Sequence, residues 1–321
     1  MYIRRFAAFA VKFSKKLDGF RCLRYNKYEI QERYGTNMLL LSNNQWKCDW
    51  NNDAWRSRGE DCSAEGRVGG LVRAYLEILP DVMGLQEVSV HMAELMMRSL
   101  DKVTLPDGTN AHYEYVSGGD TPIVYRQDKL KLLESGFFRY AEEIPGLIGS
   151  FNNGETKSYC FGVFEDRKDG KRFALMSTHL WWKSSHPESS AYQAGSDEAR
   201  AYQIRQASAR MDEIMEKYNC PGILMGDLNA SLDSLCLEAA CAEGWTEVHD
   251  LAVGACDETR GHHHCGGDGW SRDDAGTFSQ AIDHILLKNG GKAVVNSFCR
   301  LTHEWFDPIS DHYPLYIDID F

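Results

Sequence analysis

The sequence predicts a single α/β domain, and three observations lead to this class. Short apolar runs typical of β-strands follow one another from residue 37 to the end, and segments with helical spacing lie between them. No linker, low-complexity segment or repeat interrupts residues 37–321. With 43% hydrophobic and 26% charged residues in a chain of 321, the composition is that of a soluble globular protein with a substantial core.

Residues 1–36 differ from the rest in charge, and we interpret them as a basic N-terminal extension. They carry nine Lys or Arg residues against three acidic ones; since the whole chain has a net charge of −12, the remainder carries −18. The apolar run 6–11 is too short for a secretory signal. The segment is either a basic amphipathic helix that touches a membrane or partner, or a helix packed on its own domain.

The acidic body and the short apolar runs limit the partners. A net charge of −18 disfavours tight binding of duplex nucleic acid, although bound cations can reverse the field at a site. No apolar run is long enough to span a membrane. We therefore expect no transmembrane segment.

The cysteines favour a reducing compartment. Ten are present, none in a CxxC pair. Cys48, Cys160, Cys220 and Cys299 lie beside strand-like segments, where buried free thiols are common. In the absence of an export signal, this predicts a cytoplasmic protein.

The expected elements follow in chain order. The first half contains a strand ending near residue 44, a helix over 64–79 stopped by Pro80, a strand over 81–87, a helix over 89–100, and strands over 113–118, 122–126 and 129–140. A hairpin over 158–180 turns at Asp169-Gly170, and the longest helix covers 196–218 with Ser196 as N-cap. The remaining segments are a strand over 222–229, a short helix within 231–244, an irregular stretch over 253–276, strands over 281–287 and 293–301, and the closing segment 310–321.

Several of these strands end, or begin, with a polar side chain. These residues are Asn44, Glu87, His179, Asp227, Asn229, Asp283, Asp311 and His312. Each has an ordinary structural explanation, such as a helix cap, a turn or a hydrogen-bonded core histidine. Together they offer the hard oxygen ligands that Mg²⁺ or Mn²⁺ prefers, with imidazoles for proton chemistry at neutral pH. Gathered at one edge of packed sheets, they would form a hydrolytic site.

Six ordered motifs carry a resemblance to a known family: SNN, GLQEV, STHL, GDLNAS, AIDHILL and SDHYPL. In this order they resemble the magnesium-dependent endonuclease/exonuclease/phosphatase superfamily, from about Asn37 to the C-terminus. The resemblance implies a four-layer sandwich, with two mixed β-sheets packed face to face and helices outside. It also implies hydrolysis of a phosphate ester with Mg²⁺ as cofactor and Mn²⁺ as a substitute.

The resemblance implies which residues bind the metal. Glu87 is expected to be the principal metal-binding carboxylate, with Asn44 beside it. Asn43 is an adjacent competitor for the position of Asn44. Asp311 resembles a second metal contact.

The resemblance also implies catalytic roles. Asp227 is expected to orient or deprotonate the attacking water, and Asn229 to hold the nucleophile and a phosphate oxygen. His312 would touch the scissile phosphate, while Asp283 would fix the tautomer of that imidazole by a hydrogen bond. His179 resembles a histidine that binds phosphate or protonates the leaving group.

Three further residues are candidates for substrate binding. Tyr125 corresponds to an aromatic or arginine near the phosphate in many members, or it packs as an ordinary strand residue. Arg126 either reaches the phosphate or is an exposed charge. Trp182, in the loop after His179, either stacks on a sugar or base or covers the sheet edge together with Trp181.

The run His262–His264 suggests zinc, but its spacing matches no usual paired-ligand pattern, which leaves a substrate-side or solvated loop. We therefore expect a phosphatase or phosphodiesterase whose partner is a small phosphorylated metabolite. A nuclease for single-stranded or structured nucleic acid is the alternative, and a catalytically silent binding module is a third possibility. The sequence does not specify an oligomeric state.

Overall fold

The computed structural model describes residues 37–47, 59, 61–101, 103–105, 108–152, 154, 156–256 and 281–321. Its elements all lie within one compact unit, Met38–Phe321. The expected basic extension, Cys48 and His262–His264 lie outside the described residues, so the hypotheses about them stay predictions.

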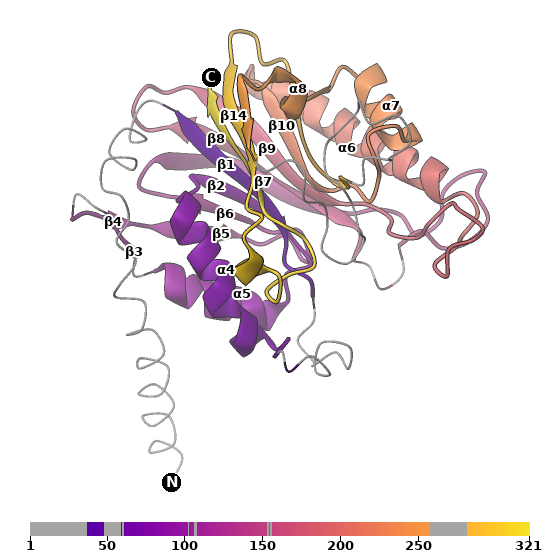
Figure 1. Cartoon of the computed structure of the whole chain (residues 1–321). Helices are drawn as coiled ribbons and strands as arrows, with labels where there is room; N and C mark the ends of the chain where they lie inside the picture. Colours follow the sequence, from indigo (N-terminus) through magenta and orange to yellow (C-terminus); the bar gives the residue numbers. More distant parts are fainter. Residues whose placement is uncertain are drawn as a thin grey trace. The chain divides into compact units, whose positions relative to one another are not determined.

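Two mixed sheets form the centre of this unit, as the resemblance predicted (Figure 1). In spatial order, the first contains β12 (Gly254–Cys256), β14 (Val294–Arg300), β15 (Leu315–Asp320), β1 (Met38–Asn44), β2 (Val82–Gln86), β6 (Ile123–Arg126) and β5 (Tyr113–Val116). The second contains β11 (Thr246–Glu247), β13 (Asp283–Lys288), β10 (Gly222–Asp227), β9 (Arg172–His179), β8 (Ser158–Asp166) and β7 (Leu130–Arg139). A short ribbon joins β3 (Val103–Thr104) to β4 (Asn110–Ala111).

Helices cover the outer faces of both sheets (Figure 1). The first sheet is covered by α4 (Ala64–Ile78) and α5 (Val90–Leu100), and the second by α6 (Ser196–Tyr218) and α7 (Leu235–Ala242). Two shorter elements are α8 (Val248–Leu251) and the 3₁₀ turn η3 (Glu304–Phe306). The four-layer α/β sandwich is thereby confirmed.

The central strands are apolar on both faces because both faces are covered. In β10, Ile223 and Met225 belong to the core between the sheets, whereas Leu224 packs in the core beneath α6. Each such fully buried side chain contributes roughly 1.5–3 kcal/mol of transfer free energy. This double burial explains the continuous run ILM, which shows no polar alternation.

Strand direction brings the polar strand ends to one edge. β1 pairs in parallel with β2, and β9 pairs in parallel with β10, with Asp227 opposite His179. β13 runs antiparallel to β10 and begins with Asp283 opposite Asp227. Since carboxyl ends of parallel strands share an edge, all these side chains lie at the same edge of the two sheets.

Several local predictions need correction. The N-cap of α6 is Gly195, with φ 81°, and Ser196 is the first helical residue, whose Oγ donates to the carbonyl of Gln193. Helix α4 ends at Ile78, one residue before the expected end, and Leu79 is its left-handed C-cap. Part of the stretch expected to be irregular forms β12, which pairs in parallel with β14.

The cysteines agree only in part with the expectation of free thiols. Cys160 and Cys220 are buried free thiols, but Cys299 is disulfide-bonded. The disulfide at Cys299 contradicts the expectation that this cysteine is a free thiol, on which the prediction of a reducing compartment partly rested. None of the described helices is long and apolar enough to cross a membrane.

Gly226 allows the chain to leave β10 at the edge where the polar residues meet. Its φ is 147°, and a Cβ there would lie 1.9 Å from the carbonyl oxygen of Thr178 on the neighbouring strand. Any side chain would push the two parallel strands apart just before Asp227.

We predict that Gly226→Ala lowers the free energy of unfolding by at least about 3 kcal/mol, because backbone atoms cannot yield to the clash. Gly69→Ala in α4 is the control, since a Cβ there meets nothing within 4 Å; it should raise stability by about 0.5–1 kcal/mol. Urea unfolding measures both. Equal effects of the two substitutions would contradict the prediction.

Candidate active site

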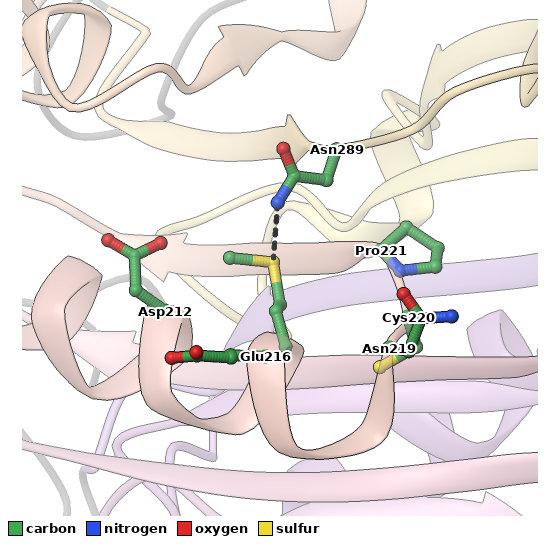
Figure 2. Close-up of a pocket in the computed structure, with 7 residues that line it drawn as sticks. Asp212, Glu216, Asn219, Cys220, Pro221 and Asn289 are labelled. Atoms are coloured by element: carbon green, nitrogen blue, oxygen red, sulfur yellow. Dashed lines mark hydrogen bonds between the residues drawn. The ribbon is translucent and has the colours of Figure 1, made fainter.

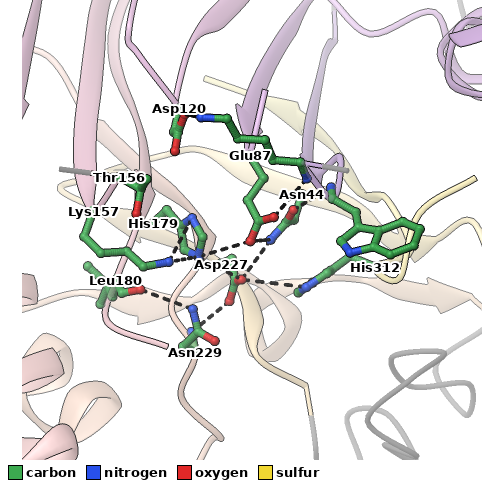
Figure 3. A network of polar contacts seen from close by, with 12 residues as sticks. Asn44, Glu87, Asp120, Thr156, Lys157, His179, Leu180, Asp227, Asn229 and His312 are labelled. Atoms are coloured by element: carbon green, nitrogen blue, oxygen red, sulfur yellow. Dashed lines mark hydrogen bonds and ion pairs between the residues drawn. The ribbon is translucent and has the colours of Figure 1, made fainter. Parts of the chain in front are cut away.

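Glu87 and Asp227 approach each other from different sheets, and Asn44 bridges them (Figure 3). The Asn44 Nδ2 donates to Glu87 Oε1 at 3.3 Å and to Asp227 Oδ2 at 3.0 Å. Glu87 follows β2 with a left-handed φ of 55°, which is unusual for a residue with a side chain. Its second oxygen accepts from the backbone N–H of Lys47 at 3.0 Å.

The structure distinguishes Asn44 from its neighbour Asn43. Because alternate residues of a strand face opposite sides, Asn43 turns toward α4, where its Oδ1 accepts from the hydroxyl of Tyr75 at 2.9 Å. Asn44 faces the cluster, but its Oδ1 accepts from the backbone N–H of Trp46 at 2.9 Å. As placed, Asn44 orients two carboxylates, and metal ligation through its oxygen would require the amide to rotate.

His312 and Asp283 form a hydrogen-bonded pair beside Asp227. Nδ1 of His312 lies 2.7 Å from Oδ2 of Asp283, while Nε2 lies 3.8 Å from Asp227 Oδ2 and 3.9 Å from Asp311 Oδ1. The hydrogen bond to a carboxylate places a proton on Nδ1. Nε2 therefore faces the middle of the cluster.

Asp227 ends β10 and is held from two sides. Its Oδ1 accepts from the backbone N–H of Asn229 at 2.9 Å, a turn made possible by the left-handed φ of 51° at Asn229. The Asn229 side chain donates to the carbonyl of Leu180 at 3.2 Å, which joins the loops after β9 and β10. Leu228, between Asp227 and Asn229, packs in the core beneath α6.

His179 is buried between the carboxylates and a lysine that the sequence analysis did not select, Lys157. Its Nε2 lies 3.4 Å from Asp227 Oδ2 and 3.8 Å from Glu87 Oε1. The ammonium of Lys157 lies 2.5 Å from the same Nε2 (Figure 3). The histidine is therefore part of a continuous polar cluster.

Burial raises the pKa values of the acids in this cluster, whereas neighbouring positive charges lower them. Burial disfavours the Glu87 carboxylate, but the fields of His179 and Lys157 and the Lys47 N–H outweigh burial and lower its pKa to about 2. Burial raises the pKa of Asp227 to about 6, and it raises the pKa of Asp311 to about 6 as well. One carboxylate is strongly stabilised as an anion, and two hold a proton more readily than usual.

The pKa values of the two histidines, His179 and His312, are shifted as well. Burial and the neighbouring Lys157 lower the pKa of His179 well below its ordinary value. Burial opposes a proton on His312, but the carboxylates of Asp283, Asp227 and Asp311 raise its pKa well above the ordinary value. At neutral pH one imidazole is neutral and the other is a cation.

The donor set fits a divalent cation with oxygen ligands. The ligand atoms of Glu87, His179 and Asp227 lie within 4.8 Å of one another, and so do those of Asp227, Asp283 and His312. Asp283 Oδ1 is buried without a hydrogen-bond partner among the described residues. Carboxylate oxygens crowded at one place are the ligands that Mg²⁺ and Mn²⁺ prefer.

A buried arginine, Arg67 of α4, holds the segments on either side of the cluster. Its guanidinium donates to the carbonyls of Gln45 at 2.5 Å, Trp46 at 2.8 Å and Ile309 at 2.9 Å. One group thus ties the segment after Asn44 to the segment that leads into Asp311 and His312. Ser310 adds a second tie, since its Oγ donates to the Asn44 carbonyl at 2.7 Å.

Two predicted substrate contacts are not brought to the cluster. Tyr125 is buried in the core between the sheets and packs on Phe164 at 5.2 Å between ring centroids. Arg126 is buried in ion pairs with Asp81 and Asp128. Because Tyr125 pairs with the first residue of β2, both lie at the opposite edge from Glu87.

The two tryptophans after β9 take different environments. Trp181 is fully buried against Phe151, whereas Trp182 keeps 46% of its surface exposed. Arg200 donates to the carbonyls of Trp181 at 3.0 Å and Lys183 at 2.7 Å, which fixes the backbone on both sides of Trp182. Trp181 covers the sheet edge, and Trp182 remains a candidate substrate contact.

A pocket of about 500 Å³ lies away from this cluster (Figure 2). It is bounded by the C-terminal end of α6 and the start of β10, so it belongs to the opposite edge of the second sheet. Its lining residues are Asp212, Met215, Glu216, Asn219, Cys220, Pro221 and Asn289. Asp212 is already paired with Lys288 at 2.6 Å, and none of the described lining residues is a histidine.

The expected hairpin did not place Lys157, because its turn lies one residue earlier in the structure than expected. A turn centred on Asp169-Gly170 would pair Cys160 with His179, but the observed register pairs Ser158 with His179. The residue before Ser158 then lies beside the end of β9. A lone lysine before a strand is usually solvated, and for this reason no sequence pattern indicated its burial.

The chain belongs to the endonuclease/exonuclease/phosphatase family, whose model matches residues 54–312. Members of this family are hydrolases that act on phosphoesters, and they generally use a divalent metal. No curated protein matches the sequence of this chain.

Solved structures share the fold at low identity. An endonuclease/exonuclease/phosphatase from Bacteroides vulgatus has a TM-score of 0.67 at 18% identity, over 89% of this chain and 100% of that one. A mannosyl-6-phosphatase from Bacteroides thetaiotaomicron has a TM-score of 0.65 at 18% identity, over 88% and 100%. TDP2 from D. rerio, complexed with a single-strand DNA product, has a TM-score of 0.59 at 18% identity, over 89% and 100%.

We predict that Arg67→Met lowers the free energy of unfolding by at least about 3 kcal/mol, because it leaves several buried carbonyl oxygens without donors. Arg98→Met is the matched control, since Arg98 is 75% exposed in a surface pair with Glu94; its effect should stay within about 0.5 kcal/mol. Chemical denaturation of both variants measures the difference. A loss below about 1 kcal/mol in Arg67→Met would contradict the role assigned to this side chain.

Proposed function

We propose that the chain hydrolyses a phosphate ester of a small metabolite by metal-assisted, in-line attack of water on phosphorus. The observation that carries the proposal is the Asp283–His312 pair, 2.7 Å long, placed beside Asp227 at the edge where both sheets end. A hydrogen-bonded imidazole and a separate buried carboxylate are the acid and base that phosphoester hydrolysis requires.

Asp227 is the residue that holds and deprotonates the attacking water in this proposal. Its burial and raised pKa give the carboxylate enough basicity to accept a proton from water. The N–H of Asn229 and the Nδ2 of Asn44 fix its two oxygens at 2.9 and 3.0 Å. A held carboxylate of this kind orients the water before attack.

His312 stabilises charge on the phosphate. Asp283 holds the proton on Nδ1 and supports a cationic ring, so Nε2–H points toward the cluster as a donor. His179 and Asn229 lie on the other side of Asp227 and would contact phosphate or the leaving-group oxygen. Donors on two sides of phosphorus are what in-line displacement needs.

A divalent cation fits this arrangement through Glu87, with Asp311 as a second contact. Glu87 is fully ionised at neutral pH, since its pKa is lowered to about 2. Bound Mg²⁺ or Mn²⁺ would supply neutralisation of the phosphate charge and polarisation of its oxygens.

A nuclease acting on single-stranded or structured nucleic acid is the second candidate. Trp182 is half-exposed with the Lys183 ammonium 5.9 Å from its ring centroid, and this pair suits a base and a backbone phosphate. One structural relative, D. rerio TDP2, is complexed with a single-strand DNA product. The net charge of −12 favours the small metabolite.

A panel of esters separates these candidates. We would assay mono- and bis-p-nitrophenyl phosphate, sugar and inositol phosphates, and single- and double-stranded DNA and RNA, each with Mg²⁺, Mn²⁺ or EDTA. Turnover of small esters alone supports the lead proposal, and efficient strand cleavage supports the nuclease. Inactivity on every substrate would favour a catalytically silent binding module.

We predict that Asp227→Asn and His312→Gln each lower kcat/KM for the best ester at least about 1,000-fold, because the first removes the base for the attacking water and the second a donor to the phosphate. The controls are Asp169→Asn, which changes an exposed aspartate in the β8–β9 turn, and His303→Gln, which changes an exposed histidine. Both controls should keep wild-type rates, and EDTA should abolish all activity. Near-normal rates in Asp227→Asn or His312→Gln, with melting curves unchanged, would refute the mechanism.

A further inference from the structure

The ammonium of Lys157 is buried at the cluster on a fixed backbone. The side chain is 4% exposed. Asn152 accepts from the Lys157 N–H at 2.8 Å and donates to its carbonyl at 2.9 Å, and the N–H of Tyr140 donates to the same carbonyl at 3.0 Å. The position of this lysine is thus determined by the fold.

The ammonium has more donors than the described residues use. An ammonium carries three N–H groups and accepts none. Its hydrogen-bond partner in the described part of the chain is the imidazole of His179, 2.5 Å away at Nε2 and 3.3 Å at Nδ1. A neutral imidazole accepts at one nitrogen only, so two N–H groups remain for other acceptors.

Burying a cation with unused N–H donors costs desolvation free energy unless an anion pairs with it. No carboxylate in the described residues forms an ion pair with Lys157, although Asp227 and Glu87 both contact the same His179 within 3.8 Å. The lysine therefore approaches the cluster along His179, on the side away from His312 (Figure 3). A phosphate bound at Asp227 would have one cationic side chain on each flank.

We propose that Lys157 binds the non-bridging oxygens of a terminal phosphate and makes the site select phosphomonoesters over phosphodiesters. This inference rests on the proposed function and narrows its substrate class. A phosphomonoester carries close to two negative charges at neutral pH, whereas a diester carries one. The second charge is what an additional buried ammonium compensates, through charge-assisted hydrogen bonds from the two spare donors.

The first test compares Lys157→Met with Lys131→Met. Lys131 is 58% exposed on the adjacent strand β7, so its substitution should leave both reactions unchanged. Lys157→Met should lower kcat/KM for p-nitrophenyl phosphate by roughly 10- to 100-fold and for bis-p-nitrophenyl phosphate by less than about 3-fold. Equal losses on both esters in a variant that melts like the wild type would overturn the inference.

A second test uses the wild-type chain and stands even where Lys157→Met does not fold. Inorganic phosphate should inhibit the reaction at a concentration at least about 10-fold lower than dimethyl phosphate, which has a diester's single charge. Equal inhibition by the two anions would refute selection for the dianion. A wild-type chain that hydrolyses neither ester with any metal would instead refute the proposed function itself.

Discussion

The polar cluster depends on how closely the two sheets approach each other at Gly84. A Cβ on this residue of β2 would lie 2.8 Å from the sulfur of Met225 and 3.2 Å from the Cβ of Ser177, both in the second sheet. Three residues further along the chain is Glu87. Because there is no side chain at Gly84, the carboxylate from one sheet can reach the strand ends of the other.

Hydrogen bonds between the two sheets fix their relative position next to the site. Gln86 donates to the hydroxyl of Ser177 at 3.0 Å, and that hydroxyl donates to the carbonyl of Leu85 at 2.8 Å. These bonds lie in the last layer before the site. A polar layer next to the cluster fixes the sheets relative to each other more specifically than apolar packing does, because each donor needs a particular acceptor.

Charge is the other constraint on the site. Four carboxyl groups lie at one edge, those of Glu87, Asp227, Asp283 and Asp311. Burial opposes the charged form of Glu87, Asp227 and Asp311. His312 offsets part of this charge through its bond to Asp283, and Lys157 offsets another part from the opposite side. The remaining excess of carboxylate is what a divalent cation would neutralise. The same balance makes both metal and phosphate natural partners of the site.

The sequence predicted the elements that carry the site, because strand ends and polar residues coincide in it. It could not distinguish Asn43 from Asn44, since the facing of a strand residue depends on which side of the sheet α4 covers. Tyr125 and Arg126 lie away from the cluster because β6 runs antiparallel to β2, so that its last residues reach the far edge of the sheet. Direction of pairing is a tertiary property.

The sequence patterns did not predict the roles of Lys157 and Arg67, for a different reason. Both act from inside the fold, where a charged side chain is rare, and neither lies in a motif of the family resemblance. Their roles appear only once the β8–β9 register and the packing of α4 on the segments beside Asn44 and Asp311 are known. The sequence determines these contacts, but through long-range packing that local patterns do not contain.

The central claim is that this cluster binds a divalent metal together with phosphate, and anomalous scattering from crystals soaked with Mn²⁺ and inorganic phosphate tests it most directly. We predict a manganese peak bonded to the Glu87 carboxylate at roughly the 2.1 Å typical of such ions, with a phosphate between it and His312. A strongest peak in the pocket beside Asp212 and Glu216, or one with no contact to Glu87, would contradict the account.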